Sequence, residues 1–265
     1  MTKPDLTVSS IVSLLLAASM LSGCGGTKVL KEPQPMQTTQ PLASASDQRV
    51  TATLDWVIVR DGPGTWAKNA DWDEYLMKVR NASDQPIQVV SVTVVDSLDR
   101  RIEAQPGRKQ LVKASKQTSR TYKKSGIKVK AGRGAATMLV AGAAVTAVGV
   151  GAASVWAYGG AWGAAGGAAA TAASGLLLLG PAVAVGGIAR GVNNSAVNKQ
   201  IEQRQTTLPL GVPAGGEVAL DVFFPLAPSP GMVEVVYTDA HGENSLFIDT
   251  SAALHGLHIP SPTDD

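Results

Sequence analysis

The sequence of 265 residues has very little of two residue types on which much protein chemistry depends, with one cysteine and three histidines. The single cysteine, Cys24, excludes an intramolecular disulfide and a cysteine-rich zinc site. All three histidines lie beyond residue 240, which leaves few metal ligands or general bases elsewhere. We therefore expect no metal, no other cofactor and no enzymatic activity, and a hydrolase is the least favoured functional class.

Charge is absent from one long stretch of the chain. No Asp, Glu, Lys, Arg or His occurs in the 56 residues between Arg133 and Arg190, and ordinary soluble surfaces are not so depleted in charge. The stretch divides into residues 135–155 and 168–189, each long enough as a helix to cross the roughly 30 Å hydrocarbon core of a bilayer. The sequence predicts an apolar, Gly/Ala-rich helical hairpin over residues 135–189, embedded either in a membrane or in the interior of a protein or oligomer.

Glycines recur at every fourth position within this stretch, at Gly159, Gly163 and Gly167. The spacing resembles the glycine zipper of membrane helices, in which small residues along one side let two helices approach closely. It predicts helix packing and self-association through these three glycines. A composition rich in Gly and Ala, or a turn between the two predicted helices, would explain the same spacing.

Basic residues are unevenly distributed along the chain. Residues 205–265 contain eight acids and no Lys or Arg, whereas residues 100–133 contain 12 Lys or Arg and one acid, Glu103. Beside a predicted membrane segment, such a cluster indicates contact with anionic lipid headgroups. A solvated face or a protein-binding face is the alternative. Nucleic acid is not an expected partner, because Tyr122 is the only aromatic residue near these cations.

The first 24 residues carry the features of an export signal. A basic start precedes an apolar run over residues 11–21, which has the length of a signal-peptide core and is too short to span a bilayer. The run ends in Leu21-Ser22-Gly23-Cys24, which resembles the lipobox of bacterial lipoproteins. The resemblance implies cleavage between Gly23 and Cys24, removal of residues 1–23 as a signal peptide, and lipidation of Cys24 with diacylglycerol and a fatty acid such as palmitate. An ordinary leader with a cysteine near its end is the alternative.

The residue after the cysteine is Gly25 rather than Asp. By resemblance to enteric lipoproteins, this favours delivery to the outer membrane, with the protein facing the periplasm. Residues 24–48 are rich in Pro, Gln, Thr and Ser and show no apolar period. We therefore expect a lipidated N-terminus followed by a flexible linker.

Alternating apolar and polar residues predict β-strands on both sides of the apolar stretch. The predicted strands cover residues 50–60, 74–81, 87–96 and 100–104 before it, and residues 207–212, 217–224, 232–239 and 245–249 after it. Turn sequences rich in Pro, Gly, Ser and Asp separate them. The fold class is therefore mainly β with an α-helical insertion, namely an antiparallel β-sandwich, of which the immunoglobulin-like form is one candidate.

The hairpin splits the predicted sandwich into two halves, residues 49–104 and residues 207–250. Neither half has enough strands to close a core alone, so we expect the halves to pair with one another. Residues 105–134 are expected to form a basic connecting segment, residues 190–206 a helical return to the second half, and residues 251–265 a C-terminal tail.

Few side chains suggest a chemical site. His255 and His258 stand three residues apart near the C-terminus, but no adequate third ligand is nearby, so a metal site is not supported. His241 fits a hairpin turn, and no nucleophile motif accompanies it. Trp66 and Trp72 lie among turn residues, where they either contact a partner from an exposed loop or fill the sandwich core.

These features are similar, at the level of a class, to bacterial lipoproteins that carry glycine-zipper segments. We therefore expect a non-enzymatic lipoprotein with a periplasmic β-sandwich and a membrane-associated hairpin, in a structural or accessory role at the outer membrane. Its expected partners are the lipid bilayer, further copies of itself or an envelope protein complex. The alternative is an oligomeric pore or secretion component assembled through the glycine-zipper helices.

Overall fold

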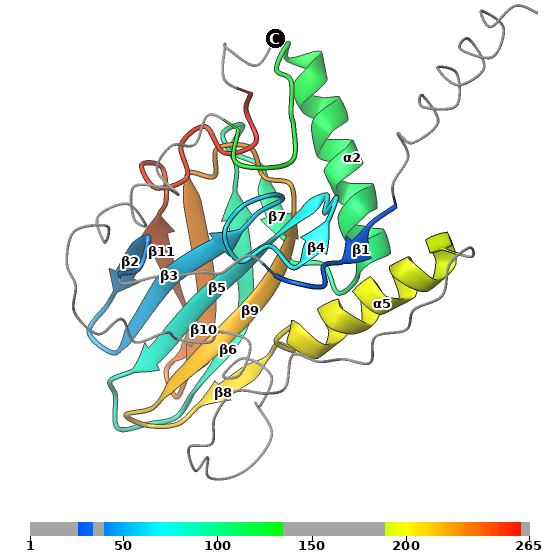
Figure 1. Ribbon diagram of the computed structural model, residues 1–265. Coiled ribbons are helices and arrows are strands. Elements are labelled where there is room, and N and C mark those ends of the chain that lie inside the picture. The colour runs from blue at the N-terminus through cyan, green and yellow to red at the C-terminus, as the bar shows by residue number, and fades with distance from the viewer. Residues whose placement is uncertain (1–25, 34–39, 135–188, 261–265) are drawn as a thin grey trace, which may run out of the picture.

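The computed structural model describes residues 26–33, 40–134 and 189–260 (Figure 1). The predicted signal peptide, Cys24, the three zipper glycines and nearly all of the predicted hairpin lie outside these residues. Among the described helices, none is both long and apolar enough to cross a membrane.

The described chain is mainly antiparallel β-structure, as the sequence predicted. Its strands are β1 (Lys28–Val29), β2 (Ala43–Ser46), β3 (Val50–Ile58), β4 (Ala67–Lys68), β5 (Trp72–Asn81), β6 (Ile87–Val95), β7 (Arg101–Glu103), β8 (Leu210–Val212), β9 (Glu217–Pro225), β10 (Met232–Asp239) and β11 (Gly242–Asp249). Its helices are α2 (Arg108–Lys124) and α5 (Ala189–Arg204).

Strands from both sides of the apolar stretch share the two large sheets. The four-stranded sheet has the order β2-β3-β5-β9, and the five-stranded sheet has the order β11-β10-β6-β7, with β8 also paired to β6. Strand β9, which follows the apolar stretch in the sequence, therefore pairs with β5, which precedes it. Strands β10 and β8 also follow the stretch, and they pair with β6, which precedes it. The prediction that the two halves pair is confirmed.

Buried side chains from both large sheets form one hydrophobic cluster. Period-two patterning explains it, because alternate residues of a strand point to the same face of a sheet. On β9, Leu220, Val222 and Phe224 contribute to this cluster, and Val218 packs against it. This is the alternation that the sequence predicted for the strand.

A second hydrophobic cluster covers the other face of the four-stranded sheet. It joins Phe223 of β9 and Trp72 of β5 to Leu111 of α2 and Ile201 of α5. The two helices thus lie over this sheet on the side away from the five-stranded sheet (Figure 1). Strand β5 is consequently covered on both faces, which explains why most of its residues are buried.

The predicted strand positions agree with the structure to within a few residues, and α5 confirms the predicted helical return. Helix α2 was not predicted, because the buried side of this polar helix includes Ser115 and Thr118 as well as Leu111 and Tyr122. The short strands β1, β2 and β4 were also missed, since two to four residues are too few to show an alternating pattern.

The described residues of the predicted linker and of the predicted tail are more ordered than expected. Residues 24–48 were expected to be a flexible linker, yet they include β1, which pairs with β4, and β2, which pairs with β3. Residues 251–265 were expected to be a tail, yet Leu254, Leu257 and His258 are fully buried. Apolar and hydrogen-bonding contacts with the sheets hold these segments, and short stretches of sequence do not show such contacts.

Candidate functional site: a basic helix beside the N-terminal strand

Helix α2 presents its cations along one side. Its six exposed basic residues, which we call the basic stripe, are Lys109, Lys113, Lys116, Arg120, Lys123 and Lys124. Steps of three and four residues place side chains on the same face of an α-helix. Four of the residues between them face the opposite way and are buried, namely Leu111, Ser115, Thr118 and Tyr122. One helix therefore separates an anchoring face from a fully basic face.

The first half of α2 is fixed by Leu111 and Ser115. The Leu111 side chain is fully buried in the second hydrophobic cluster. The Ser115 hydroxyl accepts a hydrogen bond of 3.0 Å from the backbone N–H of Leu226 and contacts the backbone carbonyl of Asp71. This hydroxyl thus satisfies backbone groups from two distant segments, which sets the position of the helix on the sheet.

The second half of α2 is fixed by Tyr122. Its hydroxyl lies 3.0 Å from the Ser97 hydroxyl and 3.4 Å from the backbone carbonyl of Pro228. The Arg100 guanidinium lies 5.1 Å from the centre of the Tyr122 ring, a cation–π contact. Burial raises the pKa of Tyr122 to about 12, so the phenol stays neutral at physiological pH.

The charges of the basic stripe are not neutralised locally. Helix α2 contains no acidic residue, and none of the six cations forms a salt bridge within the described part of the chain. Lys123 and Lys124 stand in the last turn, where a positive charge interacts favourably with the helix dipole. The stripe is therefore a positively charged surface that is free to attract an anionic partner.

The N-terminal strand packs on α5 and contributes to the same hydrophobic cluster as α2. Val29 of β1 packs against the second hydrophobic cluster, as does Val112 of α2. The backbone N–H of Leu30 donates a hydrogen bond of 2.8 Å to the carbonyl of Trp66, and Thr27 is buried. Figure 1 shows β1 between α2 and α5. Residues 27–30 are thus fixed to the helical side of the molecule.

A buried charged cluster lies beneath α5. The Arg204 Nε donates a hydrogen bond of 2.7 Å to Glu74 Oε1 and lies 3.7 Å from Asp221 Oδ2. Trp66 Nε1 donates to the other oxygen of Glu74, and the Arg204 guanidinium lies 5.6 Å from the Trp66 ring centre. Burial and the Glu74 carboxylate raise the pKa of Asp221 well above its usual value, although Arg204 acts in the opposite direction.

This buried cluster is too closed to bind a substrate. A cavity beside Trp66, Trp72 and Glu74 has a volume of about 10 Å³, which is room for about one water molecule. The two tryptophans are 6% and 3% exposed, respectively. Their predicted burial is confirmed, but they lie in the second hydrophobic cluster, between the four-stranded sheet and the helices, rather than in the cluster between the two sheets. The alternative of an exposed, partner-binding tryptophan loop is wrong.

The two C-terminal histidines have different surroundings. His258 Nε2 lies 2.6 Å from Asp73 Oδ2, and both side chains are fully buried, whereas His255 is exposed. Burial raises the pKa of Asp73 above its usual value, while the charge and hydrogen bond of His258 act in the opposite direction. Across the described residues, no group of three side chains could hold a metal ion. His258 is thus a structural partner of Asp73.

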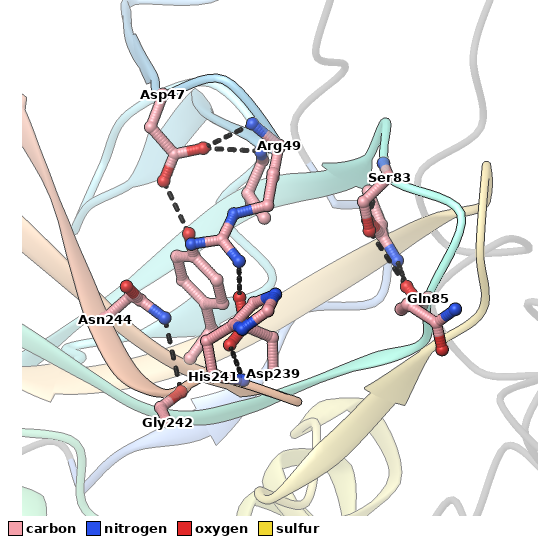
Figure 2. A network of polar contacts seen from close by, with 11 residues as sticks. Asp47, Arg49, Ser83, Gln85, Asp239, His241, Gly242 and Asn244 are labelled. Carbon is pink, nitrogen blue, oxygen red and sulfur yellow. Dashed lines mark hydrogen bonds and ion pairs between the residues drawn. The ribbon is translucent and has the colours of Figure 1, made fainter.

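A polar network joins turns of the two large sheets at one end of the molecule (Figure 2). Arg49 forms an ion pair with Asp239, and the Tyr237 hydroxyl donates to Asp47. Burial raises the pKa of Asp47, but hydrogen bonds from Tyr237 and from backbone N–H groups outweigh this effect and hold that pKa below its usual value. The His241 N–H donates to Asp239 at 2.7 Å, and the hairpin turn predicted around His241 is confirmed.

Sequence reasoning found the basic region but missed the buried charges. The cations of residues 100–133 were recognised as a group. The spacing of three and four residues between the cations of α2 was the signal that could have predicted the basic stripe. Glu74 was the first residue of a predicted strand and Asp73 stood just before it, and nothing in that local sequence showed that both acids would be buried. Their partners could not be identified, because Arg204 and His258 lie more than a hundred residues further along the chain.

Comparison with known proteins finds no matching family model, no matching curated protein and no matching solved structure. The function must therefore be argued from the chemistry of this chain.

Proposed function

We propose that this protein is a non-enzymatic envelope lipoprotein, anchored through lipid on Cys24 and held at the periplasmic face of the outer membrane in a structural or accessory role. The observation that carries the proposal is the position of the lipobox-like motif relative to the folded chain. Thr27 is buried and β1 begins at Lys28, so cleavage before Cys24 would keep every described residue in the mature protein and put the lipid three residues along the chain from Thr27.

The apolar stretch is proposed as a second membrane attachment, in the form of a helical hairpin inserted into one β-domain. Pairing of β5 with β9 and of β6 with β10 makes the flanking segments parts of one folded unit. Gly134 leaves this unit at a tight contact, since a Cβ there would lie 2.4 Å from the carbonyl oxygen of Ile259. Both ends of the stretch are therefore held by the same domain, as a hairpin requires.

For the domain itself we propose a β-sandwich of immunoglobulin-like type. The shared hydrophobic cluster of the two large antiparallel sheets supports this arrangement. A structural role is supported by the charged side chains in the interior, because Glu74 is paired with Arg204 and Asp73 with His258, and neither pair is open to a substrate.

A second candidate function is an oligomeric pore or secretion component, which the spacing of Gly159, Gly163 and Gly167 favours. A Gly163→Leu substitution separates the two candidates. Loss of a defined oligomer in detergent would support the pore, whereas an unchanged monomer would support the accessory lipoprotein.

Membrane fractionation with a carbonate wash tests the main proposal. The wild type, Cys24→Ala, a deletion of residues 135–188 and the combination of both changes are compared. We expect each single change to leave the protein in the membrane pellet, because the other attachment remains, and the combination to release it. Release of Cys24→Ala with its apolar stretch intact would contradict membrane insertion, and absence of lipid on Cys24 by mass spectrometry would contradict the lipoprotein assignment.

A further inference from the structure

We propose that the basic stripe of α2 lies against the membrane that holds the lipid anchor and binds the phosphate groups of its anionic phospholipids. This inference rests on the proposed function and adds to it an orientation of the domain and a specific lipid partner. Three features of the described chain carry it: the short distance from anchor to domain, the shape of the charged surface, and the charge of the opposite face.

The anchor leaves the domain little freedom to move away from the membrane. Only Gly25 and Gly26 separate Cys24 from the buried Thr27, so even a fully extended chain adds about 11 Å. Two residues later, Val29 packs against the cluster that also includes Leu111 of α2. Lipid on Cys24 therefore brings the helical side of the molecule to the membrane surface.

The basic stripe has the shape that a planar anionic surface requires. From Lys109 to Lys124 it extends for about 22 Å along a straight helix. The opposite side of α2 is buried, so the helix cannot rotate its cations away from the surface. Each cation close to an anionic membrane strengthens binding about fivefold, which makes the six together a strong attraction at low salt.

Charge on the far side of the molecule favours the same orientation. The outer face of the five-stranded sheet includes Glu243 and Asp249 on β11 and Glu103 on β7, all exposed. These acids would be repelled by an anionic membrane, whereas the basic stripe is attracted to it. Figure 1 shows β11 on the side of the molecule away from α2.

A lipid surface fits the stripe better than a nucleic acid or a specific acidic peptide. Five of its six cations are lysines, which act as point charges and make diffuse phosphate contacts. Specific recognition of nucleic acid would call for exposed aromatic side chains among the cations, and the only aromatic residue of α2, Tyr122, is buried.

The test uses the full-length lipidated protein in vesicles, with a fluorophore on a single introduced cysteine. Cys24 is the only natural cysteine, and its lipid blocks labelling. Gln117→Cys places the label next to the basic stripe, and Ser245→Cys places it on the outer face of the five-stranded sheet; both natural residues are exposed. Vesicles of pure phosphatidylcholine are compared with vesicles of equimolar phosphatidylcholine and phosphatidylglycerol, and neutral acrylamide is the water-soluble quencher.

We expect acrylamide quenching at residue 117 to fall severalfold in the phosphatidylglycerol vesicles and to recover in about 1 M salt, where the screening length is about 3 Å. Quenching at residue 245 should be the same in both vesicle types. Adding Arg120→Gln to the Gln117→Cys protein should shift the docked population about fivefold towards the undocked state. The matched control, Arg80→Gln, removes another exposed arginine and should change nothing.

Two failures are distinguishable. Equal quenching of the label at residue 117 in both vesicle types, with the protein still bound after a carbonate wash, would overturn the lipid contact and leave the proposed function intact. Loss of the lipidated protein from both vesicle types in the carbonate wash would overturn the proposed anchoring, and the lipid contact with it.

Discussion

At the scale of the residue, two buried carboxyl groups of the four-stranded sheet, Asp73 and Asp221, each lie near a basic side chain from a distant part of the chain. Burying a charge is costly unless it is paired or neutralised. Asp73 is paired with His258. Asp221 has a less favourable position, because Arg204 is already bound by Glu74. The raised pKa of Asp221 means that the folded protein keeps this group protonated to a higher pH than the unfolded chain does.

This protonation predicts a specific pH dependence for Asp221→Asn. The pKa of Asp221 is higher in the folded state than its usual value of 3.8, so the folded state binds the extra proton. The stability that Asp221 contributes through its proton is therefore fully present below pH 3.8. As pH rises from 3.8 towards the folded-state pKa, the free energy of unfolding falls by about 1.4 kcal/mol for each pH unit. Asn cannot ionise, so Asp221→Asn should gain stability relative to the wild type as pH rises through this window.

Urea unfolding of the detergent-solubilised protein at several pH values between about 4 and about 8 measures this effect. Asp84→Asn, at an exposed position, is the control and should follow the wild-type pH profile. An Asp221→Asn profile that runs parallel to the wild type would show that Asp221 is ionised in the folded state.

At the scale of the element, α2 depends on hydrogen bonds from its buried side as much as on apolar packing. Only Leu111 and Tyr122 are large buried side chains of this helix. Ser115 accepts a hydrogen bond from the backbone N–H of Leu226, which is itself buried. A buried donor that loses its acceptor costs about 1–3 kcal/mol.

We therefore predict that Ser115→Ala lowers the free energy of unfolding by about 1–3 kcal/mol. Ser119→Ala is the matched control one turn later, where the hydroxyl bonds only to the Ser115 carbonyl within the helix. Its effect should stay within about 0.5 kcal/mol. Urea unfolding measures both variants, and equal stability of the two would contradict the role assigned to Ser115.

The elements also show where sequence patterns succeed. Strands β3, β5, β6, β9 and β10 lie where alternation predicted them, because alternation depends only on neighbouring residues of one strand. The fold class was predicted correctly as mainly antiparallel β, and the sandwich arrangement stays a proposal. The basic region was predicted as a connecting segment, whereas its helix became evident only from contacts with the sheet.

At the scale of the whole molecule, two segments separated in the sequence share the same sheets and the same hydrophobic cluster. Strand β9 lies at the edge of the four-stranded sheet, and β10 lies at the centre of the five-stranded one. Without the second segment, β5 would lose its β9 neighbour and β6 would lose β10 and β8. Neither segment can complete the hydrophobic cluster that they share.

This interdependence predicts the behaviour of two fragments, residues 25–134 and residues 189–265. Each fragment produced alone should lack cooperative unfolding, because its strands have unpaired edges and exposed apolar faces. Produced together, the fragments should co-purify and show the circular dichroism of β-structure. Cooperative thermal unfolding of either fragment by itself would contradict the prediction.

The sequence by itself determined the positions of the long strands, the pairing of the two halves, the uncharged stretch and the basic region. The strands, the uncharged stretch and the basic region follow from composition or from spacing along a short piece of chain, and the pairing follows from the strand count, because neither half has enough strands to close a core. Only the tertiary structure decided that Trp66 and Trp72 are buried, that His258 binds Asp73, and that the N-terminal strand joins the hydrophobic cluster beneath α2 and α5. These outcomes depend on contacts between residues far apart in the sequence. Local sequence patterns do not show which distant side chain will pack against a given residue.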